Sequence, residues 1–173
     1  MEGKGLVHIY TGDGKGKTSA AAGLAVRAAG SGLRVLFVQF LKGRETGEIV
    51  SLGRLGVKTV RSEQVKKFIP YMDERELGEC RAAQQECLRA AQNGLGIYDV
   101  VILDEAIGAA QTGMIDLSEL EAMIQGKPEP VELVLTGRDA PESLVALADY
   151  VSEIRAVKHP YDRGIPARKG IEY

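Results

Sequence analysis

A glycine-rich segment with two lysines and a threonine stands near the start of this chain. It covers Thr11–Thr18 with the sequence TGDGKGKT, between the apolar run Leu6–Tyr10 and the alanine-rich stretch Ser19–Ala29. Glycines let a backbone curl until several N–H groups face one anion, and a helix N-terminus adds unpaired donors and the positive end of its dipole. The pattern therefore predicts a strand, a phosphate-binding loop and a helix in succession.

Two side chains of this loop have specific tasks in phosphate binding. Lys17 can reach the outer phosphates, and the hydroxyl of Thr18 can ligate Mg²⁺. The usual pattern GxxxxGK[ST] has glycine where this chain has Thr11, and the glycine comes one position later, so we expect an unusual branch of the P-loop class. The residues predicted to hold a nucleoside triphosphate are Gly12, Asp13, Gly14, Lys15, Gly16, Lys17, Thr18 and Ser19.

Two adjacent carboxylates, Asp104 and Glu105, end the apolar run Val100–Leu103. In P-loop proteins a carboxylate at such a strand end supports Mg²⁺ beside the phosphates. Thr18, Asp104 and Glu105 are therefore the predicted ligands of Mg²⁺ or Mn²⁺. Glu105 fits two roles, as the base for an attacking water in an ATPase or as a metal ligand in a transferase. An exposed acidic turn without a function is the alternative.

Two cations follow other predicted strands. Arg138 comes after Leu135–Gly137, and Lys42 comes after Gln39–Leu41. Because parallel strands present their carboxyl ends at one edge of a sheet, both side chains are candidates for contact with the nucleotide. The planar guanidinium of Arg138 suits bidentate contact with phosphate. A solvated side chain remains the alternative for each of them.

The segment Phe68–Met72 is unusually apolar for a loop. Phe68 and Tyr71 either cover part of the core or line a pocket for a flat, apolar ligand, and composition favours neither.

Short apolar runs alternate with helical stretches along the whole chain, which is typical of a parallel sheet with covering helices. Several runs are continuously apolar, as expected when both faces of a sheet are covered. We predict an α/β fold of the P-loop NTPase type, with residues 1–173 as a single domain. It would contain a mainly parallel sheet of about six strands with helices on both faces. The expected strands are Leu6–Tyr10, Arg34–Phe40, Val57–Val60, Ile97–Leu103, Val131–Leu135 and Val151–Val157.

Three pairs of acidic residues mark expected helix starts. Asp73 with Glu76, and Asp116 with Glu119, have the spacing of a capping box. The same spacing recurs at Asp139–Glu142, around Pro141.

The composition excludes some classes of function. A chain of 173 residues with a net charge of −2 lacks the basic surplus of a general nucleic-acid binder. No apolar run approaches the roughly 20 residues that cross a bilayer, and Met1–Lys4 leads directly into the first strand, so we expect neither a membrane span nor a signal peptide. Cys80 and Cys87 lie seven positions apart, too far along a helix for a disulfide, so we expect small buried side chains and a reducing, cytoplasmic location.

Taken together, these motifs resemble the CobA/CobO-type corrinoid adenosyltransferases over nearly the whole chain. The resemblance implies a P-loop fold, usually a homodimer, that transfers the 5′-deoxyadenosyl group of ATP to a reduced corrinoid (cobalamin or a precursor). Co(I) would attack the ribose C5′, and inorganic triphosphate would leave, with ATP reversed in the loop relative to kinases. The segments that carry the resemblance are Thr11–Thr18, Gln39–Gly43, Leu103–Glu105, Leu135–Arg138, Val157–Asp162 and Gly170–Tyr173.

The same resemblance implies roles for particular residues. Gly12–Thr18 would grip the triphosphate and stabilise its developing charge, which is the main catalytic task left to the protein. Thr18 and Glu105 would ligate Mg²⁺, and Arg138 would contact the nucleotide. Lys17, Glu105 and Arg138 are thus the expected catalytic residues. A flavoprotein reductase is the expected source of the electron.

Some features depart from the family pattern. Family members often carry a Phe-Thr-Trp element, whereas this chain has no tryptophan, so Phe68 and Tyr71 are the candidates to contact the corrinoid. The tail Lys158–Tyr173 has a composition that equally fits disorder, but the resemblance implies that it lies near the site. Two alternatives stay open: a generic P-loop ATPase or kinase, and a non-catalytic module that binds ATP or an adenosylcorrinoid.

Overall fold

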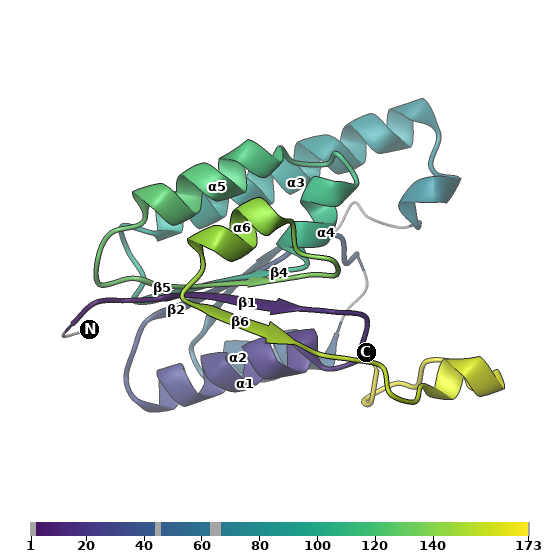
Figure 1. The fold of residues 1–173 in the computed structure, drawn as a ribbon, viewed down its shortest axis with the longest axis horizontal. Coiled ribbons are helices and arrows are strands. Elements are labelled where there is room, and N and C mark those ends of the chain that lie inside the picture. Colours follow the sequence, from purple (N-terminus) through teal and green to yellow (C-terminus); the bar gives the residue numbers. More distant parts are fainter. Residues whose placement is uncertain (1–2, 44–45, 63–66, 173) are drawn as a thin grey trace.

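A parallel β-sheet forms the centre of the computed structural model, which describes residues 3–43, 46–62 and 67–172. Its strands follow the order β3-β2-β4-β5-β1-β6, and each pairs in parallel with its neighbours (Figure 1). The strands are β1 (Val7–Thr11), β2 (Val35–Gln39), β3 (Lys58–Arg61), β4 (Val100–Asp104), β5 (Glu132–Thr136) and β6 (Tyr150–Glu153).

Helices cover both faces of this sheet (Figure 1). One face carries α1 (Lys17–Gly30) and α2 (Gly47–Arg54). The other carries α3 (Glu74–Gly94), α4 (Ala106–Gln111), α5 (Leu117–Gly126) and α6 (Glu142–Leu147). Two 3₁₀ turns, η1 (Ile69–Tyr71) and η2 (Pro160–Arg163), complete the described elements. The predicted α/β architecture, with a parallel sheet between two helical layers, is confirmed.

The alternation of side chains along buried strands explains the two layers. In β2, Leu36 and Val38 belong to the core cluster shared with α3, α4, α5 and α6. Val35 and Phe37 face the other way, into the cluster shared with α1 and α2. Because successive residues of a strand point to opposite faces, a strand covered on both sides must be apolar throughout.

Strand order decides which loops meet. The register pairs Gln39 with Asp104 across β2 and β4, and Tyr10 with Thr136 across β1 and β5. β5 therefore lies between the strand that leads into the glycine-rich loop and the strand that ends in Asp104. All these strands end at one edge of the sheet, where open α/β folds bind their ligands.

Several predicted boundaries are wrong at strand ends. β4 begins at Val100 rather than Ile97, which is 54% exposed and contributes to no strand. β6 ends at Glu153 rather than Val157, which is 89% exposed. The apolar side chains of Ile97 and Val157 resemble strand residues in sequence, although the fold leaves both of them exposed.

The predicted helix starts are confirmed at two of three positions. α3 has a complete capping box, in which Asp73 Oδ1 accepts from Glu76 N (2.8 Å) and Glu76 Oε2 accepts from Asp73 N (3.0 Å). α5 likewise begins after Asp116. A helix also starts near the third position, but α6 begins at Glu142 with Pro141 as its N-cap, so the capping spacing predicted from Asp139, whose φ is 46°, is not used.

Cys80 and Cys87 are free and buried in α3, as predicted for small core side chains. Burial raises the pKa of both thiols, that of Cys87 to about 11. Among the described residues, the helices are too short or too polar to cross a membrane.

Candidate active site

The glycine-rich loop follows β1 and is held by the segment after β6. Gly14 N donates to the carbonyl of Ile154 (2.8 Å), and a Cβ on Gly12 would lie only 2.4 Å from that oxygen. Gly12 also has a φ of 101°, which residues other than glycine rarely adopt. Asp13 Oδ1 accepts from Ala156 N (3.0 Å), a bond that lowers the pKa of Asp13. Glycine is thus required at Gly12, where two backbones nearly touch.

Lys17 begins α1 and extends its side chain back along the loop. Its ammonium donates to the carbonyls of Gly12 (2.6 Å) and Gly14 (2.9 Å), and the residue is 7% exposed. Burial lowers the pKa of Lys17. A desolvated cation bonded to neutral carbonyls can exchange those partners for phosphate oxygens, which would bond it more strongly.

Asp104 ends β4 as a fully buried carboxylate with four donors. Thr18 Oγ1 and Thr136 Oγ1 both donate to its Oδ1 at 2.8 Å. Gln39 Nε2 (3.2 Å) and Lys42 Nζ (2.8 Å) donate to its Oδ2. These donors fix the carboxylate and offset the cost of burying its charge. The residues come from the first turn of α1, from the end of β2 and the segment after it, and from the ends of β4 and β5, which only the strand order brings together.

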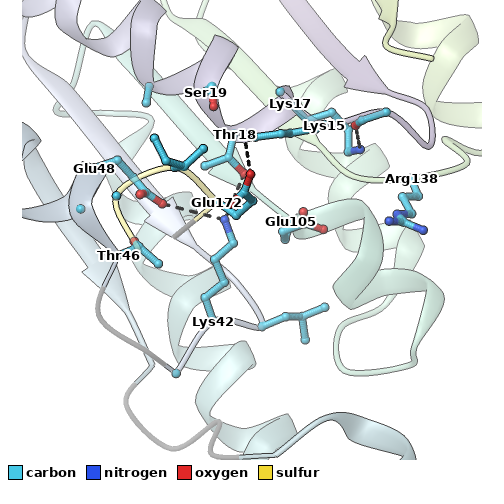
Figure 2. Close-up of a pocket in the computed structure, with 18 of the residues that line it drawn as sticks. Lys15, Lys17, Thr18, Ser19, Lys42, Thr46, Glu48, Glu105, Arg138 and Glu172 are labelled. Carbon is cyan, nitrogen blue, oxygen red and sulfur yellow. Dashed lines mark hydrogen bonds and ion pairs between the residues drawn. The ribbon is translucent and has the colours of Figure 1, made fainter. Parts of the chain in front are cut away.

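Lys42 extends from the end of β2 into a group of oxygens (Figure 2). Its ammonium lies 3.0 Å from Thr18 Oγ1, 2.8 Å from Asp104 Oδ2 and 4.0 Å from Glu48 Oε1. We call Thr18, Asp104 and Glu48 the oxygen cluster. Glu48 Oε1 also accepts from Gln39 Nε2 (3.1 Å). Hydroxyl and carboxylate oxygens that surround a positive charge are the donor set that Mg²⁺ prefers.

The described residues contain no group of three or more His, Cys, Asp or Glu side chains that could hold a metal ion. The oxygen cluster therefore fits Mg²⁺ only as a partial site that needs further ligands. Mg²⁺ is commonly held in this way, by one or two carboxylates together with substrate phosphates and waters.

Glu105 joins β4 to α4 in the left-handed conformation, with a φ of 61°. Its backbone N–H donates to Thr136 Oγ1 (2.9 Å), which in turn donates to Asp104. The Glu105 side chain lines the pocket. Burial raises its pKa, and the charge of Asp104 raises it further. Thr136 thus fixes both acidic residues at the end of β4.

Arg138 follows β5 on the same side of the pocket as Glu105 (Figure 2). Its backbone carbonyl accepts from Gln111 Nε2 (3.1 Å), and the next carbonyl, of Asp139, accepts from the same atom (2.7 Å). These bonds fix the loop and leave the guanidinium facing the cavity.

The C-terminal tail returns to the loop. His159, Gly170, Ile171 and Glu172 line the pocket. Glu172 Oε1 accepts from Lys15 Nζ (3.2 Å) and from Arg168 (3.0 Å). The bond to Arg168 is the main cause that lowers the pKa of Glu172 to about 2. The tail thus lies at the site, as the resemblance implied, except that Tyr173 falls outside the described residues.

The pocket at this edge of the sheet has a volume of about 830 Å³. Gly12 and Asp104 lie behind its wall rather than in it. Tyr71 lies in η1, is 77% exposed and is absent from the lining. The predicted residues that line the pocket are Asp13, Gly14, Lys15, Gly16, Lys17, Thr18, Ser19, Lys42, Phe68, Glu105 and Arg138.

Three residues had no predicted role but take part in the contacts around Asp104 and Lys42. Thr136 and Gln39 are the last residues of buried strands, and a polar residue there was the available signal. Glu48 lies in the first turn of α2 and gave no signal, because only the packing of α2 brings it to Lys42.

Comparison with known proteins extends over this whole architecture. A sequence profile for the family described as ATP:corrinoid adenosyltransferase BtuR/CobO/CobP matches residues 3–173. Corrinoid adenosyltransferase CobA of Salmonella typhimurium is 35% identical over 174 residues, which cover 100% of this chain and 88% of that protein.

Two further relatives give the same picture. A corrinoid adenosyltransferase of Escherichia coli is 36% identical over 171 residues, with 98% of this chain and 86% of the relative covered. One of Pseudomonas aeruginosa is 34% identical over 173 residues, with 98% and 84% covered.

Proposed function

The chain belongs to the ATP:corrinoid adenosyltransferase family, and on that premise we propose how its own residues carry out the reaction. The protein is an enzyme that transfers the adenosyl group of ATP to a corrinoid, so ATP and a corrinoid are its substrates. The electron pair of Co(I) forms the bond to the ribose C5′. The C5′–O5′ bond breaks, and O5′ keeps the bonding pair as part of the leaving triphosphate.

This chemistry requires no general base, because no proton leaves the carbon. The protein must instead hold the triphosphate and stabilise the charge that develops on O5′. Lys17 is suited to this task, since its desolvated ammonium donates only to the carbonyls of Gly12 and Gly14 among its described hydrogen bonds. That arrangement is the observation on which we base the triphosphate site. Arg138 would contact the nucleotide from the loop after β5.

We assign a divalent metal to Thr18 and Asp104 of the oxygen cluster, with Glu105, which lies outside the cluster, as the third candidate protein ligand. The cluster already surrounds a cation, the ammonium of Lys42, which supports this assignment. Mg²⁺ or Mn²⁺ bound there would supply positive charge to the leaving triphosphate. Burial and the charge of Asp104 raise the pKa of Glu105 although Lys42, Lys17 and Arg138 lower it, so a metal bound beside this carboxylate would favour its charged form.

The corrinoid would approach from the side of the pocket that carries Phe68 and the tail. Phe68 lines the pocket and is 77% exposed, so a flat apolar ring could cover it. Gly170–Glu172 would complete the same side. We further propose that residues 1–173 act as one domain, that the enzyme is a cytoplasmic homodimer, and that a flavoprotein reductase supplies the electron. The two free thiols support the reducing compartment.

A product analysis tests the reaction. The protein is mixed with ATP, Mg²⁺ and chemically reduced cobalamin, and adenosylcobalamin is followed by absorbance while phosphates are separated by ion exchange. We expect adenosylcobalamin and inorganic triphosphate in equal amounts. Release of ADP and phosphate would instead indicate an ATPase or kinase, and tight ATP binding without any product would indicate a binding module.

A further inference from the structure

The ammonium of Lys42 lies where a metal bound to the oxygen cluster would lie. It donates to Thr18 Oγ1 (3.0 Å) and Asp104 Oδ2 (2.8 Å), and Glu48 Oε1 is 4.0 Å away. Thr18 and Asp104 are also residues to which the proposed function assigns the metal, so the inference rests on that proposal. Lys42 already fills this position before any ligand binds.

Two cations cannot share these oxygens at low cost. Asp104 Oδ2 and Thr18 Oγ1 each have limited room for partners, and positive charges a few ångströms apart repel strongly in a partly buried site. Asp104 is fully buried, and the side chain of Lys42 is only 26% exposed, so water screens this repulsion weakly. A metal that enters must therefore displace the ammonium.

Lysine is suited to such a displacement. Its charge sits at the end of a flexible four-carbon chain with several rotatable bonds. Asp104 keeps three donors when the ammonium leaves, from Thr18, Thr136 and Gln39. The Thr18 hydroxyl can keep donating its proton to Asp104, while the lone pair that accepted from Lys42 becomes free for the metal. The carboxylate therefore remains held while the cation beside it changes.

We propose that Lys42 is an exchangeable internal cation. In the ligand-free enzyme it neutralises the oxygen cluster, and it yields this position when the metal arrives with the triphosphate. The displaced ammonium then pairs with the triphosphate, whose negative charge is present only at that moment. Lys42 is thus a positioning residue that makes the metal and the nucleotide bind together and prevents the metal from binding alone.

The test measures the binding of Mn²⁺ alone, by the electron paramagnetic resonance signal of the free ion. Lys42→Met keeps the length of the side chain and removes its charge, so we expect it to bind Mn²⁺ about tenfold or more tightly than the wild type. Lys42→Arg keeps the charge and should show no gain. Lys67→Gln is the matched control, because Lys67 also lines the pocket but donates to Glu76 instead of the cluster.

A second measurement uses the wild-type protein and does not depend on any variant. Mn²⁺ retained by the protein is measured by equilibrium dialysis with and without inorganic triphosphate, and the Mn·triphosphate complex in the protein-free chamber is subtracted. The affinity of the protein for Mn²⁺ should rise about tenfold or more when the anion is present to accept Lys42. The proposal is overturned if Lys42→Met binds Mn²⁺ no more tightly than the wild type. It is also overturned if Lys67→Gln gains as much, or if triphosphate leaves the wild-type affinity unchanged.

Failure of this inference is distinguishable from failure of the proposed function. If the wild type makes adenosylcobalamin and Thr18→Val weakens Mn·ATP binding, the metal site stands whatever Lys42 does. If Thr18→Val and Asp104→Asn both leave Mn·ATP binding unchanged, the metal does not bind at the oxygen cluster. The proposed metal site then fails, and the role of Lys42 fails with it.

Discussion

The two sides of the pocket are built differently. On one side, Asp104 is fully buried, Lys17 is 7% exposed, and their polar atoms are already hydrogen-bonded without a ligand. On the other side, Phe68 is 77% exposed, and an ion pair between Glu172 and the partly exposed Lys15 links the tail to the glycine-rich loop. The first side is preorganised for a ligand of fixed shape and charge. The second is left open for a large ring that must complete it.

This difference matters for catalysis because the triphosphate needs fixed charged groups, whereas the corrinoid needs apolar contact area. A triphosphate leaves with more charge than it had as an ester, so the groups that stabilise it must be fixed beforehand. A corrinoid offers a broad apolar face, so most of the binding energy can come from contact area gained at the moment of binding. Substitutions on the first side should therefore affect nucleotide binding and stability, and those on the second should affect only the acceptor.

The largest effect is expected at Lys17. Removing its ammonium in Lys17→Ala deletes charge-assisted bonds worth about 1.5–3 kcal/mol each, so affinity for Mg·ATP should fall about 100-fold or more in isothermal calorimetry. Lys15→Ala is the matched loop variant, since the Lys15 side chain is 45% exposed and pairs with Glu172. It should weaken binding much less. An equal loss of Mg·ATP affinity in the two variants would show that the burial of Lys17 gives it no greater role in binding than Lys15.

Thr136→Val should lower both stability and nucleotide affinity. The variant keeps the shape of the side chain but removes one of the four donors to Asp104 and the acceptor of the Glu105 backbone N–H, at a cost of about 1–3 kcal/mol in the free energy of unfolding. Denaturant titration measures this loss. Thr112→Val removes a more exposed hydroxyl bonded to the carbonyl of Gly108 and should cost less than about 0.5 kcal/mol.

On the open side, Phe68→Ala should raise the KM for the corrinoid roughly tenfold, because an aromatic contact is worth about 1–2 kcal/mol. Affinity for Mg·ATP should not change. Tyr71→Ala is the control, since Tyr71 is equally exposed but lies outside the pocket. If Phe68→Ala weakens nucleotide binding instead, the division between the two sides is wrong.

The smallest effect concerns pH at the tail. Arg168 holds the pKa of Glu172 at about 2, below the ordinary value of about 4.3. A lowered carboxyl pKa stabilises the fold of the tail above the ordinary pKa, and this contribution is lost as the pH falls towards 2. Carbon NMR of the Glu172 carboxyl should give this midpoint, and Arg168→Gln should move it upwards. An unchanged midpoint in Arg168→Gln would exclude the ion pair as the cause.

Local patterns were enough to predict the parts of the fold that depend on neighbours in sequence. The glycine-rich loop, the buried strands and the capping box at Asp73 each carry their own signal within a few residues. Strand ends such as Val157 were mispredicted, because an exposed valine has the same propensity as a buried one and only the folded sheet tells them apart.

Local sequence signals also predicted which residues gather at the candidate site, but only where those residues stand beside strand ends. Lys17, Thr18, Asp104 and Glu105 stand beside strand ends, so their gathering follows from a parallel sheet. The role of Thr136 needs the strand order, since it depends on β5 lying between β1 and β4. Glu48 and the difference between Phe68 and Tyr71 need tertiary packing, which no local pattern records.

Three residues that follow strands at this edge of the sheet have a strained backbone. Leu41, Glu105 and Asp139 follow β2, β4 and β5 and have φ values of 56°, 61° and 46°. A left-handed backbone costs a side-chain-bearing residue about 1–2 kcal/mol that glycine would not incur. At Glu105, a substitution by glycine that stabilises the backbone would also remove the carboxylate. Asp139 lies outside the pocket lining, so a substitution by glycine there can relieve the strain without touching the site. Thermal stability and turnover are therefore in conflict at Glu105 but not at Asp139.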